Sequence, residues 1–200
     1  MLLPLHIFEE RYKLMIGRCI DERAPFGVVL MRSGEEVGGS AEPHDVGTTA
    51  RIARFERLPD GRLNLIALGG RRFRIASVDH SEPYLIGEVE YLESEAVDAP
   101  EVDDLAQRVA ALFAEQFRLL LAISGQWQRR TGLPSEPDAL ADFVAGQIDV
   151  LPSTKQELLE TLSLPARLAR EVELLGDRIR VLSERWEAQR REKFAGAALN

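Results

Sequence analysis

The residues that could carry catalysis are few in this sequence, and their spacing excludes three common kinds of active site. A phosphate-binding loop needs a Gly-Lys pair, because backbone amides hold the phosphates while the lysine reaches them. The lysines of the chain are Lys13, Lys155 and Lys193, and none of them follows a glycine. No histidine precedes a glutamate, as in the metal-binding helix of zinc peptidases, and no serine stands in a Gly-x-Ser-x-Gly turn. The sequence therefore predicts no catalytic residue and excludes a P-loop ATPase.

Metal and thiol chemistry are also disfavoured. Cys19 and three scattered histidines are too few ligands for a typical zinc site, so we expect no metal and no cofactor. We interpret Cys19 as a small apolar residue of a helix rather than a reactive thiol. A single cysteine cannot form an intramolecular disulfide, which fits a reducing cytoplasm. No apolar run approaches the ~18 residues that span a bilayer, and the chain does not begin like a signal peptide. We therefore expect a cytoplasmic protein without membrane contact.

The charge balance is acidic and disfavours nucleic acid as a partner. The chain has 25 basic and 33 acidic residues and a net charge of -8, whereas proteins that follow a phosphate backbone are usually basic. Its most concentrated basic stretch is Arg71-Arg72-Phe73-Arg74. Three arginines beside an aromatic ring are compatible with a phosphate or RNA site. The pattern favours a structural role instead, with Phe73 in the core and the arginines paired with carboxylates.

The elements that position these residues change in character near residue 100. Before it, short apolar or β-branched runs alternate with turn residues, which is typical of a small barrel or curled sheet. Residues 59–62 (PDGR) predict a turn, because proline presets φ and glycine accepts a positive φ. We expect Gly69 and Gly70 to break the chain between two strands. The expected elements are a helix over 7–20, a loop over 33–45, and strands over 26–31, 47–57, 63–68, 73–78 and 84–92.

After Pro100 the apolar residues recur with a helical period. They predict a long helix over about 101–129, with Gly125 as a candidate for an earlier end. Ser135 and Ser153 each begin a sequence typical of a capping box and predict short helices that reach residues 148 and 162. Pro165 suits the first turn of a final helix. Residues 96–101 have linker character, so we place one domain at 1–97 and a second at 98–200.

The final helix has the sharpest pattern in the chain, an apolar residue at alternating steps of four and three. Its members are Leu168, Val172, Leu175, Ile179, Leu182 and Trp186. This spacing is a heptad seam. We expect the seam to pack within the chain against the 101–129 helix, and a homodimeric coiled coil is the alternative.

Several stretches, taken in order, resemble the N-terminal domain of Lon proteases. They are residues 3–12 (LPLHIFEERY), 26–30 (FGVVL), 46–50 (VGTTA), 58–62 (LPDGR), 69–75 (GGRRFRI), 155–160 (KQELLE) and 166–168 (ARL). The resemblance covers almost the whole chain. It implies an α+β fold, with a small PUA-like β-barrel followed by a helical bundle that ends in a long C-terminal helix.

The resemblance also implies residues with a structural role and one departure from the family pattern. The structural residues are Pro4, Leu5, Phe8, Glu9, Arg11, Tyr12, Gly47, Thr48, Gly69, Arg72 and Phe73. Because Glu9 and Arg72 both lie in matching stretches, we expect them to form an ion pair. Family members usually have a strand and a Phe-Pro-Gly-like turn before the segment that begins here at Met1. We therefore expect the natural protein to begin upstream of Met1.

In Lon proteases this domain recognises substrates, so the resemblance implies a stand-alone, non-enzymatic substrate-binding module. We expect it to bind unfolded or partly folded proteins, and an adaptor for a protease or chaperone is one form of that role. Leu182 and Trp186 are candidate protein-binding residues, because they lie near the free end of the last helix. A PUA-like module for nucleic acid, or a regulatory site for a small molecule, is the alternative.

Overall fold

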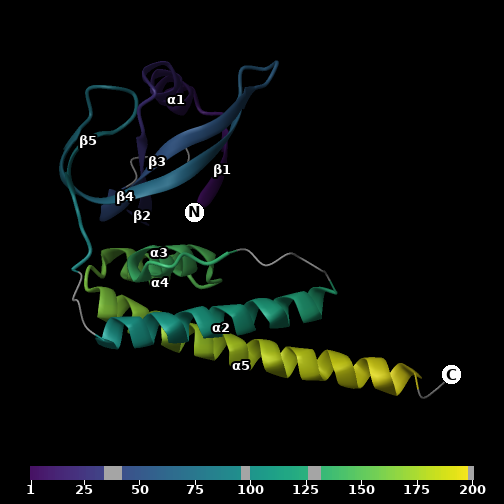
Figure 1. The fold of residues 1–200 in the computed structure, drawn as a ribbon. Helices are drawn as coiled ribbons and strands as arrows, with labels where there is room; N and C mark the ends of the chain where they lie inside the picture. Colours follow the sequence, from purple (N-terminus) through teal and green to yellow (C-terminus); the bar gives the residue numbers. More distant parts are fainter. Residues whose placement is uncertain (34–41, 96–99, 126–131, 198–200) are drawn as a thin grey trace. The chain divides into compact units, whose positions relative to one another are not determined.

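The chain folds into two compact units (Figure 1). The computed structural model describes residues 1–33, 42–95, 100–125 and 132–197. The first unit contains Met1–Glu93 together with Pro152–Glu160, and the second contains Ser94–Leu151 and Thr161–Asn200. The domain boundary predicted at 97/98 lies outside the described residues. A five-stranded antiparallel sheet and five helices, the last one long, confirm the predicted α+β class.

The first unit is built on the sheet, and two helices belong to it. Its elements are β1 (Leu2–Ile7), α1 (Glu10–Glu22), β2 (Phe26–Ser33), β3 (Glu42–Arg57), β4 (Leu63–Asp79), β5 (Ile86–Tyr91) and α4 (Pro152–Glu160). The strands run in the order β1-β4-β3-β2, and β5 pairs with the far part of β4. Ile16 of α1 is fully buried in one cluster with Leu63, Leu65 and Ala67 of β4. Helix α1 therefore covers the inner face of the sheet.

The start of the chain differs from the expected helix over 7–20. Leu2–Ile7 is a strand that pairs with Leu63–Leu68 of β4, and the helix begins only at Glu10. Alternating burial along β1, with Leu3, Leu5 and Ile7 against the core, is the period of a strand. Pro4 is tolerated in it because β1 lies at the edge of the sheet.

The predicted break at Gly69 and Gly70 is wrong, because β4 continues through both glycines. The register shifts there: Thr48 lies opposite Arg72, whereas Ala50 lies opposite Gly69. The extra residue on β4 forms a bulge, at which the Thr49 hydroxyl accepts a hydrogen bond from the Arg71 amide at 2.9 Å. A Cβ on Gly70 would lie 2.7 Å from that hydroxyl oxygen. The glycine therefore permits an irregular strand instead of ending it.

Helix α4 belongs to the sheet unit although it is distant in sequence. Gln156 is buried, and its Nε2 donates to the Val46 carbonyl of β3 at 3.0 Å and to Glu160 Oε1 at 2.7 Å. His44 of β3 lies 3.4 Å from Glu160 Oε1. The first residue of α4 is Pro152, so Ser153 lies inside the helix and not at a cap. The sheet is therefore completed by a helix that lies more than sixty residues after β5.

The second unit consists of α2 (Pro100–Ser124), α3 (Pro137–Gln147) and α5 (Leu164–Ala197). Leu168 and Leu175 of the α5 seam are buried in one cluster with Val109 of α2 and Val144 of α3. The prediction that the seam packs within the chain is therefore confirmed. Phe113 and Phe143 meet edge to face, with their ring centres 5.8 Å apart.

The helix ends agree with the sequence in one place and differ in another. Helix α2 ends at Ser124, where Gly125 takes a φ of 65°, so the predicted earlier end is confirmed. Residues 126–129 of the expected helix lie outside the described residues. Helix α3 begins after Glu136, which makes no side-chain capping hydrogen bond, so the predicted capping box at Ser135 is wrong. Pro137 stands at the helix start instead, where its missing N–H costs nothing.

Arg167 is the largest fully buried side chain of the second unit. It lies in the stretch 166–168 that carries the resemblance, and its Nη2 contacts Asp138 and, at 3.7 Å, Asp142 of α3. Both carboxylates remain about half exposed. The pairing therefore ties α5 to α3 while the negative charges stay in contact with solvent.

Candidate functional site

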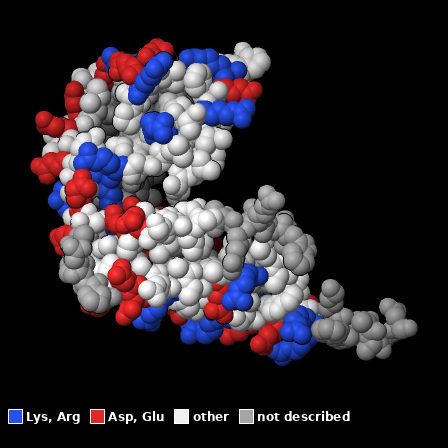
Figure 2. Space-filling view, viewed as in Figure 1, with Lys and Arg blue, Asp and Glu red and all other residues white. Residues whose placement is uncertain are grey.

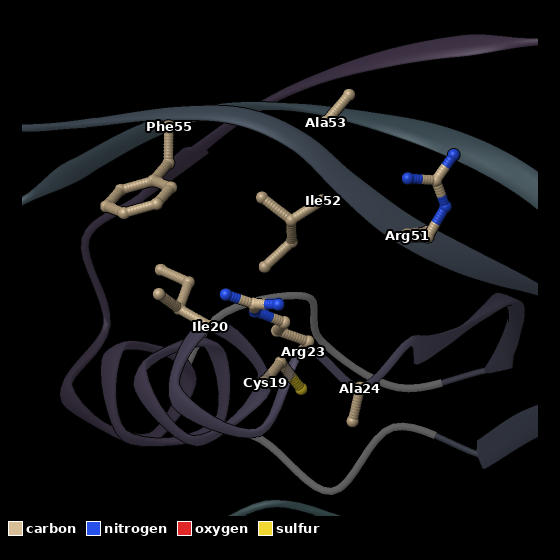
Figure 3. Close-up of a pocket in the computed structure, with 8 residues that line it drawn as sticks. All are labelled: Cys19, Ile20, Arg23, Ala24, Arg51, Ile52, Ala53 and Phe55. Atoms are coloured by element: carbon tan, nitrogen blue, oxygen red, sulfur yellow. The ribbon is translucent and has the colours of Figure 1, made fainter.

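A groove of about 320 Å³ lies between α1 and β3 in the first unit (Figure 3). This volume is at the lower end of the ~300–1,000 Å³ common for ligand sites. Its lining residues are Cys19, Ile20, Arg23, Ala24, Arg51, Ile52, Ala53 and Phe55. Four of them come from the end of α1 and the residues after it, and four come from consecutive or nearly consecutive positions of β3.

A bulge in β3 directs two apolar side chains into this groove. Ile52 lies opposite Ala67 and Arg54 lies opposite Ile66, so Ala53 is an extra residue on β3. Residues three apart in a regular strand face opposite sides. Because of the extra residue, Ile52 and Phe55 face the same side, opposite the buried Ala67 and Leu65. Figure 3 shows both side chains pointing toward Ile20 of α1, while Ala53 points away.

Phe55 is the most exposed large apolar residue of the groove, with 43% of its surface accessible. Ile20 and Ile52 are partly buried and pack against the sheet core. Arg57, next on the same face of β3, places its guanidinium 6.0 Å from the centre of the Phe55 ring. The groove therefore combines an apolar wall with an adjacent cation.

Arg23 enters the groove because of how α1 ends. Its φ of 54° is in the left-handed region, and the Arg23 amide donates to the Ile20 carbonyl at 3.3 Å. The Ala24 amide donates to the Cys19 carbonyl at 3.0 Å, which completes the end of the helix. Glycine is the usual residue in this conformation. In Figure 3 the Arg23 guanidinium lies between α1 and Ile52.

Cys19 lines the same groove and is partly buried. Burial raises the pKa of its thiol, and the nearby charge of Glu22 raises that pKa further. A raised pKa lowers the fraction of nucleophilic thiolate at neutral pH. The direction of this shift agrees with the interpretation of Cys19 as an unreactive thiol.

The residues proposed from the sequence do not gather at this groove. Gly47 and Phe73 are buried together, with a Cβ on Gly47 falling 2.8 Å from Phe73 Cζ. Thr48 lies opposite the buried Arg72, and Gly69 is exposed on β4.

The predicted Glu9–Arg72 ion pair is replaced by a local one. Among the described residues, Glu9 Oε2 accepts a hydrogen bond from Arg11 Nε at 2.8 Å. Arg11 also lies over the Tyr12 ring, 4.6 Å from its centre. Pro4 and Phe8 are exposed and Leu5 packs against the sheet core.

The two candidate binding residues of α5 have different environments. Leu182 is 5% exposed, so little of its side chain is accessible to a protein partner. Trp186, one turn further on, is partly exposed. Gln189 Nε2 donates to the Ile123 carbonyl at 3.4 Å, which shows that α5 still contacts α2 beyond both residues. Helix α2 therefore still contacts α5 beyond the C-terminal end of the heptad seam.

Sequence reasoning missed the groove residues, although one signal was present. The stretch RIARFER at 51–57 has apolar residues three apart, which breaks the two-residue period of a strand. Such a break inside a strand marks a bulge. Without the position of α1, the sequence does not show that the bulge faces a cavity.

Among the residues that the structure describes, no group of three or more His, Cys, Asp or Glu side chains is arranged to hold a metal ion. None of the helices, as far as they are described, is long and apolar enough to cross a membrane.

Comparison with known proteins connects this fold to a family. The family model for the ATP-dependent protease La (LON) substrate-binding domain matches residues 1–177. Lon protease of Anaeromyxobacter dehalogenans (strain 2CP-C) is 30% identical over 182 residues, which cover 90% of this chain and 22% of that protein. Lon protease 2 of Myxococcus xanthus is 29% identical over 182 residues, with the same coverage. The chain therefore spans about a fifth of the length of these relatives.

Solved structures show the same fold. The crystal structure of a Lon N-terminal domain protein from Xanthomonas campestris has a TM-score of 0.57 and 25% identity, covering 85% of this chain and 87% of that one. The N-terminal domain of Lon protease from the Mycobacterium avium complex has a TM-score of 0.60 and 20% identity, covering 88% and 90%. Because the family model extends over most of the 200 residues, the chain belongs to the LON substrate-binding domain family.

Proposed function

We propose that this chain binds apolar segments of unfolded or partly folded proteins and that the groove between α1 and β3 receives them. The observation that carries the proposal is the half-exposed Phe55 ring beside Ile20 and Ile52 at a cavity. Exposed apolar surface at a cavity is a common mark of an interaction site. Membership in a substrate-binding family supports the same role. Handing such segments to a protease or chaperone, as a cytoplasmic adaptor, is the cellular form of the role that we propose.

The binding test compares the two folding states of one model protein. The purified chain is titrated with a model protein whose disulfides have been reduced and whose cysteines have been carboxamidomethylated, and with the native form of the same protein, at low and at high salt. We expect preference for the unfolded form, and we expect it to persist at high salt because apolar contacts are not screened. Equal affinity for both forms contradicts the proposal. Binding only to RNA, lost as salt rises, favours the nucleic-acid alternative.

We also propose that this chain by itself has neither ATPase nor peptidase activity. Support comes from the absence of a Gly-Lys pair in the sequence and from a family match that is confined to a substrate-binding domain. Incubation of the chain with ATP and unfolded casein should release no phosphate and no peptide above a blank. The control is a parallel preparation from cells without the expression plasmid. ATP-dependent degradation seen with the chain and not with that control contradicts the proposal.

A further inference from the structure

The groove lies beside a strand edge that has no partner. Strand β2 pairs with β3 only between Glu42 and Ala50. Beyond Ala50, β3 continues to Arg57 and pairs with β4 on one side. On the other side of this stretch, which includes Ile52 and Phe55, the described residues provide no further strand. Such an edge presents unpaired backbone N–H and C=O groups, which a further strand can pair with.

The two faces of this edge differ in chemistry. Ile52 and Phe55 lie on the inner face, opposite Ala67 and Leu65. Arg54 lies on the outer face, opposite Ile66, and Arg51, opposite Leu68, also lines the groove. A strand added here would have successive side chains on alternate faces. Its inward residues would meet Ile52 and Phe55 in the groove, which the Arg23 side chain also lines, and its outward residues would meet Arg54.

The arginines at this edge have no acidic partner within the described structure. Arg23, Arg51, Arg54 and Arg57 form no ion pair with a described carboxylate, whereas Arg11, Arg18 and Arg62 of the same unit each do. Figure 2 shows blue Lys and Arg side chains together with red Asp and Glu side chains at the end of the first unit that holds α1 and the β3–β4 turn. In a chain of net charge -8, four arginines without an ion pair to a described carboxylate lie at this edge.

These charges also select against other occupants. Charged residues at an edge hinder pairing with neutral strands, and like charges directly opposite each other are destabilising. A second copy of this chain pairing through the same edge would bring arginines against arginines. Nucleic acid would satisfy the arginines and stack on Phe55, but it would leave the backbone edge unpaired. An acidic polypeptide can form backbone hydrogen bonds with the strand edge, place apolar side chains in the groove and pair its carboxylates with the arginines.

We propose that the free edge of β3 from Arg51 to Arg57 binds an extended polypeptide segment in which apolar and acidic residues alternate. The segment adds to β3 as a strand, its apolar side chains enter the groove beside Phe55, and its carboxylates lie near Arg51 and Arg54. This inference rests on the proposed function, because it specifies which protein segments the module takes and how it holds them.

The first experiment tests strand addition with synthetic peptides of alternating leucine and glutamate. Affinity is measured by fluorescence anisotropy with a dye at one end. Because only every second amide of an added strand faces its partner, methylation of one alternate set of backbone nitrogens should abolish binding. Methylation of the other set should leave binding within a fewfold. Equal effects of both methylated sets overturn the proposal.

The second experiment tests charge and groove with variants of the full chain. Arg54→Glu should lower the affinity for the leucine–glutamate peptide at least tenfold and should raise the affinity for a leucine–lysine peptide. Phe55→Ala should also weaken binding of the leucine–glutamate peptide. Arg23→Gly removes the groove guanidinium while suiting the φ of 54°. Because the proposal places the carboxylates of the segment near Arg51 and Arg54, this variant should change the affinity for the acidic peptide less than Arg54→Glu does. The matched control is Arg74→Glu, an exposed position of β4 outside the groove.

The third measurement determines where the peptide binds. Cys19 lines the groove and is the single cysteine of the chain, so its rate of alkylation reports occupancy there. Saturating acidic peptide should slow this alkylation at least fivefold, whereas the leucine–lysine peptide should not. Unchanged alkylation with bound peptide overturns the proposed location.

The outcomes separate this inference from the function on which it rests. If an unfolded model protein binds the wild type, the Arg54→Glu variant and the Phe55→Ala variant equally, the site is wrong while the proposed function stands. If the unfolded protein does not bind the wild type, both fail. If oligouridylate displaces the peptide and shows the same dependence on Arg54, the edge is a nucleic-acid site and the inference is overturned.

Discussion

Gly47 lies where two strands and an aromatic ring approach each other closely. A Cβ at this position would fall 2.6 Å from the Val28 carbonyl oxygen and 2.8 Å from Phe73 Cζ. The first of these atoms is backbone and the second belongs to a buried ring, so neither can move without disturbing the sheet. The need for glycine here comes from space, because Gly47 does not have a positive φ.

We therefore expect Gly47→Ala to lower the free energy of unfolding by about 1–3 kcal/mol, the usual range for overpacking. Gly17→Ala is the matched control, since a Cβ there would meet nothing within 4 Å. It lies inside α1, where alanine is preferred over glycine by about 0.5–1 kcal/mol. Urea denaturation of both variants gives the comparison. A Gly47→Ala variant as stable as the wild type contradicts this account of the close approach.

Cys19 gives a pH-dependent prediction at the same scale. Burial and the charge of Glu22 raise the pKa of its thiol, so less thiolate is present at any pH near neutrality. Alkylation of the folded chain at pH 8 should therefore be slower than that of a cysteine-containing model peptide, and denaturant should abolish the difference. Glu22→Gln should lower the pKa and speed alkylation of the folded chain. A folded chain that reacts as fast as the peptide contradicts the prediction.

Helix α4 shows how an element far along the sequence completes the sheet. Gln156 is 5% exposed and donates to the Val46 carbonyl, so its amide supplies a buried hydrogen bond between α4 and β3. The residue lies in the stretch 155–160 that carries the family resemblance. A buried glutamine with a backbone partner explains why a polar residue stands at this point in a helix.

Gln156→Ala should cost about 1–3 kcal/mol of stability, because it leaves a buried carbonyl without its partner. Gln189→Ala provides the control: it is the same substitution in a helix, but its carbonyl contact is exposed, and we expect a change within about 0.5 kcal/mol. Urea unfolding followed by circular dichroism measures both. Equal effects at the two positions would show that the Gln156 contact adds no stability.

The two halves of the molecule differ in how well their sequences predict them. The seam of α5 could be predicted because a helix repeats one environment every few residues, and packing against α2 preserves that repeat. The sheet was harder, since its irregular points depend on contacts made at a distance. Gly69 and Gly70 predict a break, yet β4 continues through a bulge at which the Thr49 hydroxyl accepts a hydrogen bond from the Arg71 amide.

The candidate site was harder still to predict. It requires Ala53 to form a bulge, Arg23 to adopt a left-handed conformation and β2 to separate from β3 after Ala50. Each of these depends on which elements lie side by side, and no local pattern encodes that. Some motif residues, such as Gly47 and Phe73, lie where close packing restricts the choice of residue, whereas Pro4, Phe8 and Gly69 are exposed.

The discontinuous first unit has a consequence for synthesis on the ribosome. The chain emerges from its N-terminus, so all five strands are available before Gln156 has been translated. Until then the Val46 carbonyl lacks its glutamine partner, and the nascent sheet is incomplete. More than fifty further residues, including α2 and α3, must be made before α4 can dock. Contacts so distant in sequence form slowly. The first unit therefore acquires its last element, α4, only after residues 152–160 have been translated.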